Sequence, residues 1–245
     1  MKTKTRNARN RIAALATNGD GRSSKRSAEK REERAKREAV KVIPLREKII
    51  TVRIVGTSPY MQSKFSKTNQ QKIMDTQSAG QQAKSKRRRE PRNYEKDYEG
   101  ATHFFEGGRE PGIPASAFRN ALISACKLVG FHMTKAKCAI FAEADGVDDE
   151  GTGLVKIEGK REMSLKPGRN ADFSCDIRSR PIWKKWAANL RLRFDEDQFS
   201  VSDVINLLIR VGAQIGIGEG RHDSKKSNGI GYGCFSVKFA EGAGK

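Results

Sequence analysis

The order of strand and helix patterns in this sequence predicts an α+β fold. Apolar residues alternate over residues 48–55 and 186–194, as they do in strands with one buried face. Over residues 114–129 and 201–211 apolar residues recur at helical spacing. Each helix lies between strand patterns, so the order is that of two β-α-β halves. It predicts a ferredoxin-like (RRM-like) antiparallel sheet with two helices on one face.

The first strand and the first helix are the N-terminal elements of this prediction. In KIITVRIV, residues 48–55, every second residue from Ile50 is apolar. The helix begins near Pro114, where the missing N–H of proline is harmless, and Gly130 ends it. Its apolar face consists of Ala117, Phe118, Ala121, Leu122, Ala125 and Leu128.

The middle of the chain is predicted to hold short strands and turns. We expect a strand at residues 138–144 (CAIFAEA) and an acidic turn at residues 146–153. Residues 154–158 and 161–165 predict a hairpin through a glycine-lysine turn. Residues 167–170, which include proline and glycine, predict a loop.

The C-terminal part is predicted to run from a helix through a glycine-rich loop into the last strand. Ser200 and Asp203 have the spacing of a capping box, and Gly212 is expected to end the helix. Phe235 and Val237 alternate as the buried face of the strand would. A nucleotide-binding P-loop follows a strand and opens a helix, so this loop is not one.

The charge of the chain predicts a polyanionic partner. Lys and Arg total 49 against 29 Asp and Glu, which gives a net charge of +20, and such an excess favours nucleic acid. Much of it lies in an N-terminal arm, residues 1–45, and in a basic insertion at about residues 64–100. We expect the arm to be mostly disordered with a helical part. The insertion interrupts the domain, residues 46–240, which a short tail at 241–245 follows.

No cofactor, metal or membrane partner is predicted. The four cysteines form no CxxC pair, so neither a zinc site nor a redox motif is indicated. The N-terminus lacks the apolar core of a signal peptide, and no apolar run approaches ~18 residues. We therefore expect a cytoplasmic protein.

Three stretches resemble the RAMP superfamily, which comprises RNA-binding subunits of CRISPR effector complexes and their processing relatives. VRIVGTSPYMQS, IPASAFRNALISA and GIGEGR…SNGIGYGCFSV are similar to that family's opening strand, first helix and glycine-rich loop before the last strand. Arg119 stands where the family often has lysine, and Ala115 replaces a usual glycine. The resemblance spans about residues 48–239 and implies RNA binding in a bacterial or phage-infected cell, along the strand as a homo-oligomer or in a ribonucleoprotein.

The predicted partner is single-stranded nucleic acid, with RNA favoured over DNA. Glycine backbone with adjacent cations suits phosphate oxygens, and aromatic rings such as Tyr60 or Tyr232 suit bases. The predicted binding residues are Arg87, Arg88, Arg89, Arg119, Arg191, Arg193, Arg221, Lys225, Lys226, Gly229, Gly231 and Tyr232.

Three alternatives to a non-enzymatic RNA-binding protein stay open from the sequence. A single-stranded DNA-binding or annealing protein of a phage or mobile element would use the same groove, because only contacts to the 2′-OH separate RNA from DNA. A metal-independent RNase needs a positioned acid or base. For that role His222 is the best placed histidine, whereas Asp75 and Asp97 have no supporting motif. A structural protein that binds nucleic acid through its tail is the third alternative.

Overall fold

The computed structural model describes residues 42–78, 91–169, 175–224 and 229–238. By its contacts the chain divides into Met1–Pro44 and Leu45–Lys245, and the elements below belong to the second unit. The predicted arm up to residue 41 and the tail at 241–245 lie outside the described residues. The fold is mixed α+β with three antiparallel sheets. No helix in the described ranges has the length and hydrophobicity of a membrane span.

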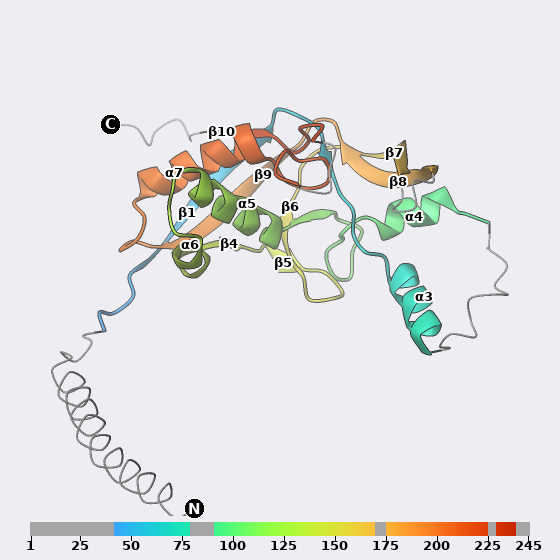
Figure 1. Cartoon of the computed structure of the whole chain (residues 1–245), viewed down its shortest axis with the longest axis horizontal. Helices are drawn as coiled ribbons and strands as arrows, with labels where there is room; N and C mark the ends of the chain where they lie inside the picture. The colour runs from blue at the N-terminus through green and yellow to red at the C-terminus, as the bar shows by residue number, and fades with distance from the viewer. Residues whose placement is uncertain (1–41, 79–90, 170–174, 225–228, 239–245) are drawn as a thin grey trace, which may run out of the picture. The chain divides into compact units, whose positions relative to one another are not determined.

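A four-stranded antiparallel sheet forms the centre of the fold (Figure 1). Its strand order is β10 (Phe235–Lys238), β1 (Glu47–Gly56), β9 (Ala187–Asp195) and β4 (Ile140–Glu143). The strands predicted at residues 48–55 and 186–194 are thus confirmed. Ile54 and Leu190 are fully buried on one face of the sheet. The other face carries polar and charged side chains, because successive residues of a strand point to opposite faces.

Helices α5 (Ala115–Leu128) and α7 (Val201–Arg210) lie side by side over the apolar face (Figure 1). Phe118 and Leu122 of α5 and Leu208 of α7 are fully buried in the same core as the sheet. The predicted capping box at the start of α7 is present, because the Ser200 hydroxyl accepts from the Asp203 amide and the Asp203 carboxylate from the Ser200 amide. Both predicted helices are therefore confirmed.

A short helix, α6 (Met133–Ala139), takes the place of the first part of the strand predicted at residues 138–144. The strand β4 begins only at Ile140. A short apolar run does not distinguish a strand from a buried helix by its pattern alone, which explains the error. Arg119 of α5 donates a hydrogen bond from Nη2 to the Lys137 carbonyl at 2.5 Å and so helps to hold the end of α6.

Two three-stranded antiparallel sheets complete the fold. One has the order β2 (Tyr60–Met61), β8 (Cys175–Trp183) and β7 (Arg161–Arg169), and the other β3 (Gly112–Pro114), β6 (Gly153–Lys156) and β5 (Gly146–Val147). The hairpin predicted between residues 154–158 and 161–165 is wrong, because β6 pairs with β3 and β5 whereas β7 pairs with β8. Alternation identifies a strand but does not identify its partner.

The loop predicted at residues 167–170 is also wrong, because Pro167 and Gly168 belong to β7 and pair with β8. Proline is tolerated there because β7 is an edge strand, in which a missing N–H breaks no central ladder. The ribbon of β7 and β8 is therefore longer than the sequence predicts.

The predicted basic insertion is partly helical. It contains α3 (Lys67–Ser78), which buries no residue, and α4 (Tyr94–Gly100), which packs against β8. Arg161 of β7 lies over the buried ring of Tyr98 in α4, with 4.4 Å between guanidinium and ring centroid. Arg87, Arg88 and Arg89 lie outside the described residues.

Gly212 does not end the helix as predicted. The chain continues through a π-helical turn, η2 (Val211–Ile215), and leaves it at Gly216, whose φ is +74°. An added β-carbon at Gly212 would collide with the carbonyl oxygen of Phe235 in β10. Glycine is therefore needed at this position because the helix approaches the strand closely.

We predict that Gly212→Ala lowers the free energy of unfolding by about 2 kcal/mol, because the methyl group overpacks the contact between η2 and β10. The matched control is Gly108→Ala, since a β-carbon at Gly108 would meet its nearest neighbour at 3.8 Å. That variant should stay within about 0.5 kcal/mol of the wild type. Denaturant unfolding of the three proteins measures the difference, and equal stabilities of the two variants would contradict the close contact.

Candidate nucleic-acid interface

A cleft of about 850 Å³ opens between the glycine-rich loop, the β7–β8 ribbon and β2. The start of α5 also lines it, through Pro114 and Ala117. Its volume lies in the range of sites that enclose a small ligand or a segment of a larger one. The predicted glycine-rich loop thus forms part of the wall of a cavity.

The wall formed by the glycine-rich loop is held together by close contacts between backbones. A β-carbon at Gly218 would collide with the Met61 carbonyl of β2, and one at Gly233 would collide with the Ile217 carbonyl. Both glycines have positive φ, +77° and +71°. The amide of Gly233 donates to the Pro59 carbonyl at 2.8 Å, and that of Glu219 to the Met61 carbonyl at 2.9 Å. The loop is therefore fixed against β2.

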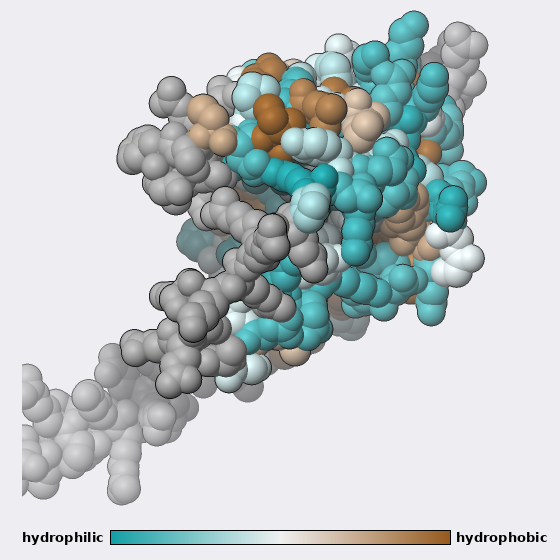
Figure 2. Space-filling model, turned by 90° about the vertical axis from the view of Figure 1, so that its right-hand side faces the viewer, coloured by the Kyte–Doolittle hydropathy of each residue, from teal (hydrophilic) through white to brown (hydrophobic). Residues whose placement is uncertain are grey.

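The wall formed by β7 and β8 presents polar side chains on one face of the ribbon. Ser164 is paired with Arg180 and Lys166 with Arg178, and all four line the cleft. Residues that alternate with them, Met163, Leu165 and Ile177, are exposed and apolar. Figure 2 views the side of the molecule that carries this ribbon and shows mostly hydrophilic side chains with a hydrophobic group near the top. The ribbon thus turns its cations toward the cleft.

Cations outnumber carboxylates in the cleft. Lys166, Arg178, Arg180 and Arg221 line it, whereas Glu219 is the one carboxylate among the described residues of its lining. The Lys166 ammonium donates to the Tyr232 hydroxyl, and Nε of Arg180 donates to Glu219 at 3.0 Å. Both contacts join the ribbon to the glycine-rich loop. An excess of cations over carboxylates suits phosphate oxygens.

Apolar surface in the cleft comes from the part of the glycine-rich loop that directly precedes β10. Ile230 is 50 % exposed, and the partly buried ring of Tyr232 follows two residues later. Tyr60 is 1 % exposed and packs at centroid distances of 5.5 and 5.6 Å from Trp183 and Trp186. The stacking role predicted for Tyr60 is therefore wrong, because its ring belongs to the core, whereas Ile230 and Tyr232 present apolar surface to the cleft.

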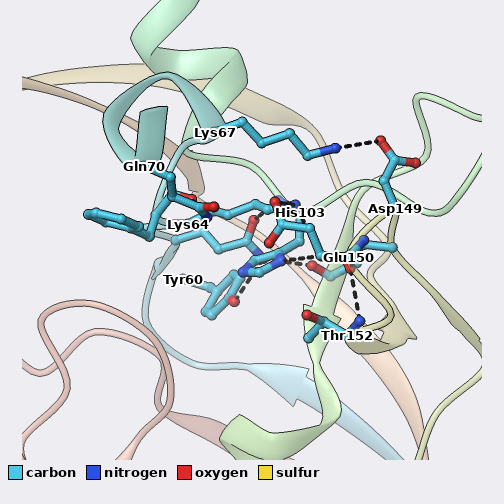
Figure 3. A network of polar contacts seen from close by, with 12 residues as sticks. Tyr60, Lys64, Lys67, Gln70, His103, Asp149, Glu150 and Thr152 are labelled. Carbon is cyan, nitrogen blue, oxygen red and sulfur yellow. Dashed lines mark hydrogen bonds and ion pairs between the residues drawn. The ribbon is translucent and has the colours of Figure 1, made fainter. Parts of the chain in front are cut away.

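A histidine and a carboxylate lie together beside the same cleft. They belong to the network of polar contacts around His103 that Figure 3 shows. His103, which lines the cleft, has Nδ1 3.0 Å from Oδ2 of the buried Asp148. Lys64 donates to the same carboxylate at 3.1 Å, and the amides of Glu150 and Thr152 donate to its other oxygen at 2.9 Å. Because an ionised carboxylate only accepts hydrogen bonds, this pairing selects the Nδ1–H tautomer of His103.

The environment separates the protonation states of this pair. Burial by itself raises the pKa of Asp148, but the hydrogen bonds from His103, Thr152, Lys64 and Glu150 outweigh it and hold that pKa well below its ordinary value. Burial lowers the pKa of His103, and the nearby Lys64 charge adds to this effect, whereas Asp148 opposes it. At pH 7 Asp148 is therefore ionised and His103 is neutral.

Three of the predicted binding residues lie elsewhere. Arg191 and Arg193 are on the open face of the central sheet, where Arg191 donates to the Ala144 carbonyl at 2.6 Å and Arg193 pairs with Glu143 at 2.8 Å and with Glu47. Arg119 lies over the Phe141 ring at 5.1 Å and holds α6. These arginines are engaged with the protein itself, so the geometry gives them no part in the cleft.

The other predicted residues belong to the glycine-rich loop. Arg221 and Tyr232 line the cleft, and Nη1 of Arg221 donates to the Gly218 carbonyl at 3.0 Å. Gly229 and Gly231 have positive φ, +63° and +85°. A β-carbon at Gly231 would meet the His222 ring at 2.8 Å, so His222 lies against the loop rather than in the lining of the cleft. Lys225 and Lys226 lie outside the described residues.

Sequence reasoning missed several residues of the cleft. Lys166, Arg178, Arg180, Ile230 and His103 all line it. The alternation of Arg178 and Arg180 is the signal of a strand with a cationic face. The pairing of β7 with β8, which brings Lys166 beside Arg178, has no local signal.

Comparison of the sequence with protein-family models and with curated proteins gave no match. Among the described residues, no group of three or more His, Cys, Asp or Glu side chains is arranged to hold a metal ion. The geometry of the cleft therefore carries the functional argument.

We predict that Asp148→Asn lowers the free energy of unfolding at pH 7 by about 2 kcal/mol, because its charged hydrogen bonds with Lys64 and His103 are lost. The folded-state pKa of Asp148 is depressed, so its contribution is present above the unfolded value of about 4 and disappears as pH falls through the folded value. The acid-induced loss of stability should therefore be shallower in the variant.

The control for this prediction is the neighbouring Asp149→Asn, whose side chain is 62 % exposed and paired with Lys67 at 3.6 Å. It should leave stability nearly unchanged, because exposed ion pairs contribute little. Unfolding by urea between about pH 2 and pH 7 measures both variants, because the Asp148 contribution is lost below about pH 4. Parallel curves for wild type and Asp148→Asn would contradict the assignment.

Proposed function

We propose that the protein binds single-stranded nucleic acid, with RNA favoured over DNA, in the cleft between the glycine-rich loop and the β7–β8 ribbon. The observation that carries the proposal is the concentration of Lys166, Arg178, Arg180 and Arg221 in one cleft with a loop of glycine backbone. Cations and backbone amides of this kind bind phosphate oxygens without reading sequence. Ile230 and Tyr232 offer surface to unpaired bases.

We also infer that the central sheet and its two helices form a ferredoxin-like domain related to the RAMP superfamily. The strand order β10-β1-β9-β4, with α5 between β1 and β4 and α7 between β9 and β10, supports this inference. The position of the glycine-rich loop between α7 and β10 supports it further. The preference for RNA rests on this kinship, and a single-stranded DNA-binding or annealing protein of a phage or mobile element is the alternative.

The size of the cleft supports a role beside other chains. A volume of about 850 Å³ encloses a short segment of a strand. A longer strand would therefore pass over further copies of this protein or over other subunits of a ribonucleoprotein. We propose such an assembly in the cytoplasm of a bacterial or phage-infected cell.

We predict that Arg221→Ala weakens binding of a fluorescein-labelled oligouridine by about fivefold, or about 1 kcal/mol, because one phosphate contact is lost. The slope of log Kd against log salt should fall by about 0.7. Arg191→Ala is the matched control, because Arg191 is bound to Ala144 on the open sheet face. It should change affinity by less than about twofold. Fluorescence anisotropy measures the affinity of both variants, and melting curves check that they are folded. A larger loss of affinity for Arg191→Ala than for Arg221→Ala would contradict the cleft and indicate that the strand binds to the open face of the sheet.

A second candidate function, metal-independent RNA cleavage, is favoured by the pairing of His103 with Asp148 at the edge of this cleft. Nε2 of His103 has no hydrogen-bond partner within the described part of the chain, and in the Nδ1–H tautomer it carries a lone pair. It would take the proton of a 2′-OH while O2′ bonds to phosphorus. The P–O5′ bond then breaks, the 5′-oxygen takes a proton from water, and a 2′,3′-cyclic phosphate remains.

If this second function holds, His103→Ala should slow cleavage of a bound RNA by about 100-fold or more, since that is what a general base contributes. Affinity should stay within about twofold, because a neutral side chain is lost. His222→Ala is the control and should cleave like wild type. Gel analysis in EDTA follows the products, and a 2′-deoxy strand should stay intact. Wild-type protein that leaves the bound RNA uncut would limit the function to binding.

A further inference from the structure

The cleft contains an ion pair between its two walls. Arg180 comes from β8 and Glu219 from the glycine-rich loop, and Nε of Arg180 lies 3.0 Å from Oε2 of Glu219. The side chains are 23 % and 34 % exposed, so solvent and a ligand reach both. In the free protein the carboxylate therefore occupies part of a guanidinium that lines the cleft.

The backbone of Glu219 is fixed by the fold, whereas its carboxylate is held by an ion pair. Its amide is hydrogen-bonded to the Met61 carbonyl at 2.9 Å, and the glycines on both sides, Gly218 and Gly220, hold positive φ values of +77° and +85°. Among the described residues the carboxylate makes its one side-chain contact with Arg180. Rotation about the side-chain bonds would release Arg180 without moving the loop.

A carboxylate and a phosphate compete for the same guanidinium. Arginine binds both with the same planar arrangement of N–H donors. A strand that enters the cleft must displace Glu219 from Arg180 or pass a negative charge that faces its phosphates. Either route costs affinity, whereas the remaining cations, Lys166, Arg178 and Arg221, attract the strand.

We propose that Glu219 is an internal competitor for nucleic-acid phosphate: it occupies Arg180 in the free protein and is replaced by a phosphate of the bound strand. This inference rests on the proposed function of the cleft. It assigns Arg180 as a phosphate-binding residue and Glu219 as the residue that limits affinity at that position.

The test compares Glu219→Gln with a matched variant of the same charge change. Glu99 of α4 pairs with Arg161 at 2.7 Å outside the lining of the cleft. The exposed fractions of this pair, 45 % for Glu99 and 21 % for Arg161, are comparable to those of Glu219 and Arg180, 34 % and 23 %. Glu219→Gln should bind fluorescein-labelled oligouridine about fivefold more tightly than wild type, because the competing ion pair is gone. Glu99→Gln should gain less than about twofold, because its added charge is screened.

The salt dependence gives a second readout. In wild type the displaced carboxylate takes up a cation when the phosphate replaces it, which offsets the counterion released from that phosphate. In Glu219→Gln this uptake is absent, so the slope of log Kd against log salt should steepen by about 0.7. The slope of Glu99→Gln should stay at the wild-type value.

A double-variant cycle decides whether Glu219 acts through Arg180. In an Arg180→Ala background Glu219→Gln should gain no more than Glu99→Gln does in wild type. An undiminished gain there would overturn the inference, because Glu219 would then act as a general repulsive charge. Equal gains for the two glutamine variants in the wild-type background, or weaker binding by Glu219→Gln at an unchanged melting temperature, would also overturn it. Failure of the proposed function is distinguishable, because wild type itself would then not bind the oligouridine.

Discussion

The contact of the glycine-rich loop with β2 is the constraint on which the cleft depends. At Gly218 and Gly233 the backbones approach so closely that a β-carbon would collide with a carbonyl oxygen. The Gly233 amide also donates a hydrogen bond to the Pro59 carbonyl. The part of the loop next to β10 is therefore fixed, as is the part around Gly218. Arg221, Glu219, Ile230 and Tyr232 owe their positions in the cleft to this packing.

The distribution of ion pairs explains why net charge alone does not locate the interface. On the open face of the central sheet, Arg53 pairs with Glu158 and Arg193 with Glu143 and Glu47, so that face is nearly neutralised by its own carboxylates. In the cleft, within the described ranges of the chain, Lys166 contacts the neutral hydroxyl and the ring of Tyr232, and Arg221 donates to the Gly218 carbonyl. Cations with neutral partners keep their attraction for phosphate.

The sequence was sufficient for elements whose pattern is local and insufficient for pairings that are not. Strands 48–55 and 186–194 and the capping box at Ser200 were predictable, because side-chain period and cap chemistry are properties of neighbouring residues. The partner of β7 was not, because pairing across the chain leaves no local pattern. This is why Arg221 and Tyr232 were found from the loop, whereas Lys166, Arg180 and His103 required the structure.

Met61, the last residue of β2, and the following residue Gln62 connect the two sides of the cleft. On one side, the Met61 carbonyl anchors Glu219 of the glycine-rich loop. On the other, the buried Gln62 donates to the Gly112 carbonyl at 2.6 Å and accepts the His103 amide at 2.9 Å. A buried side chain whose hydrogen bonds are all made has little freedom to move. The cationic wall and His103 therefore share one rigid support, so under the proposed function a strand bound at the loop would also lie at a fixed position relative to the imidazole.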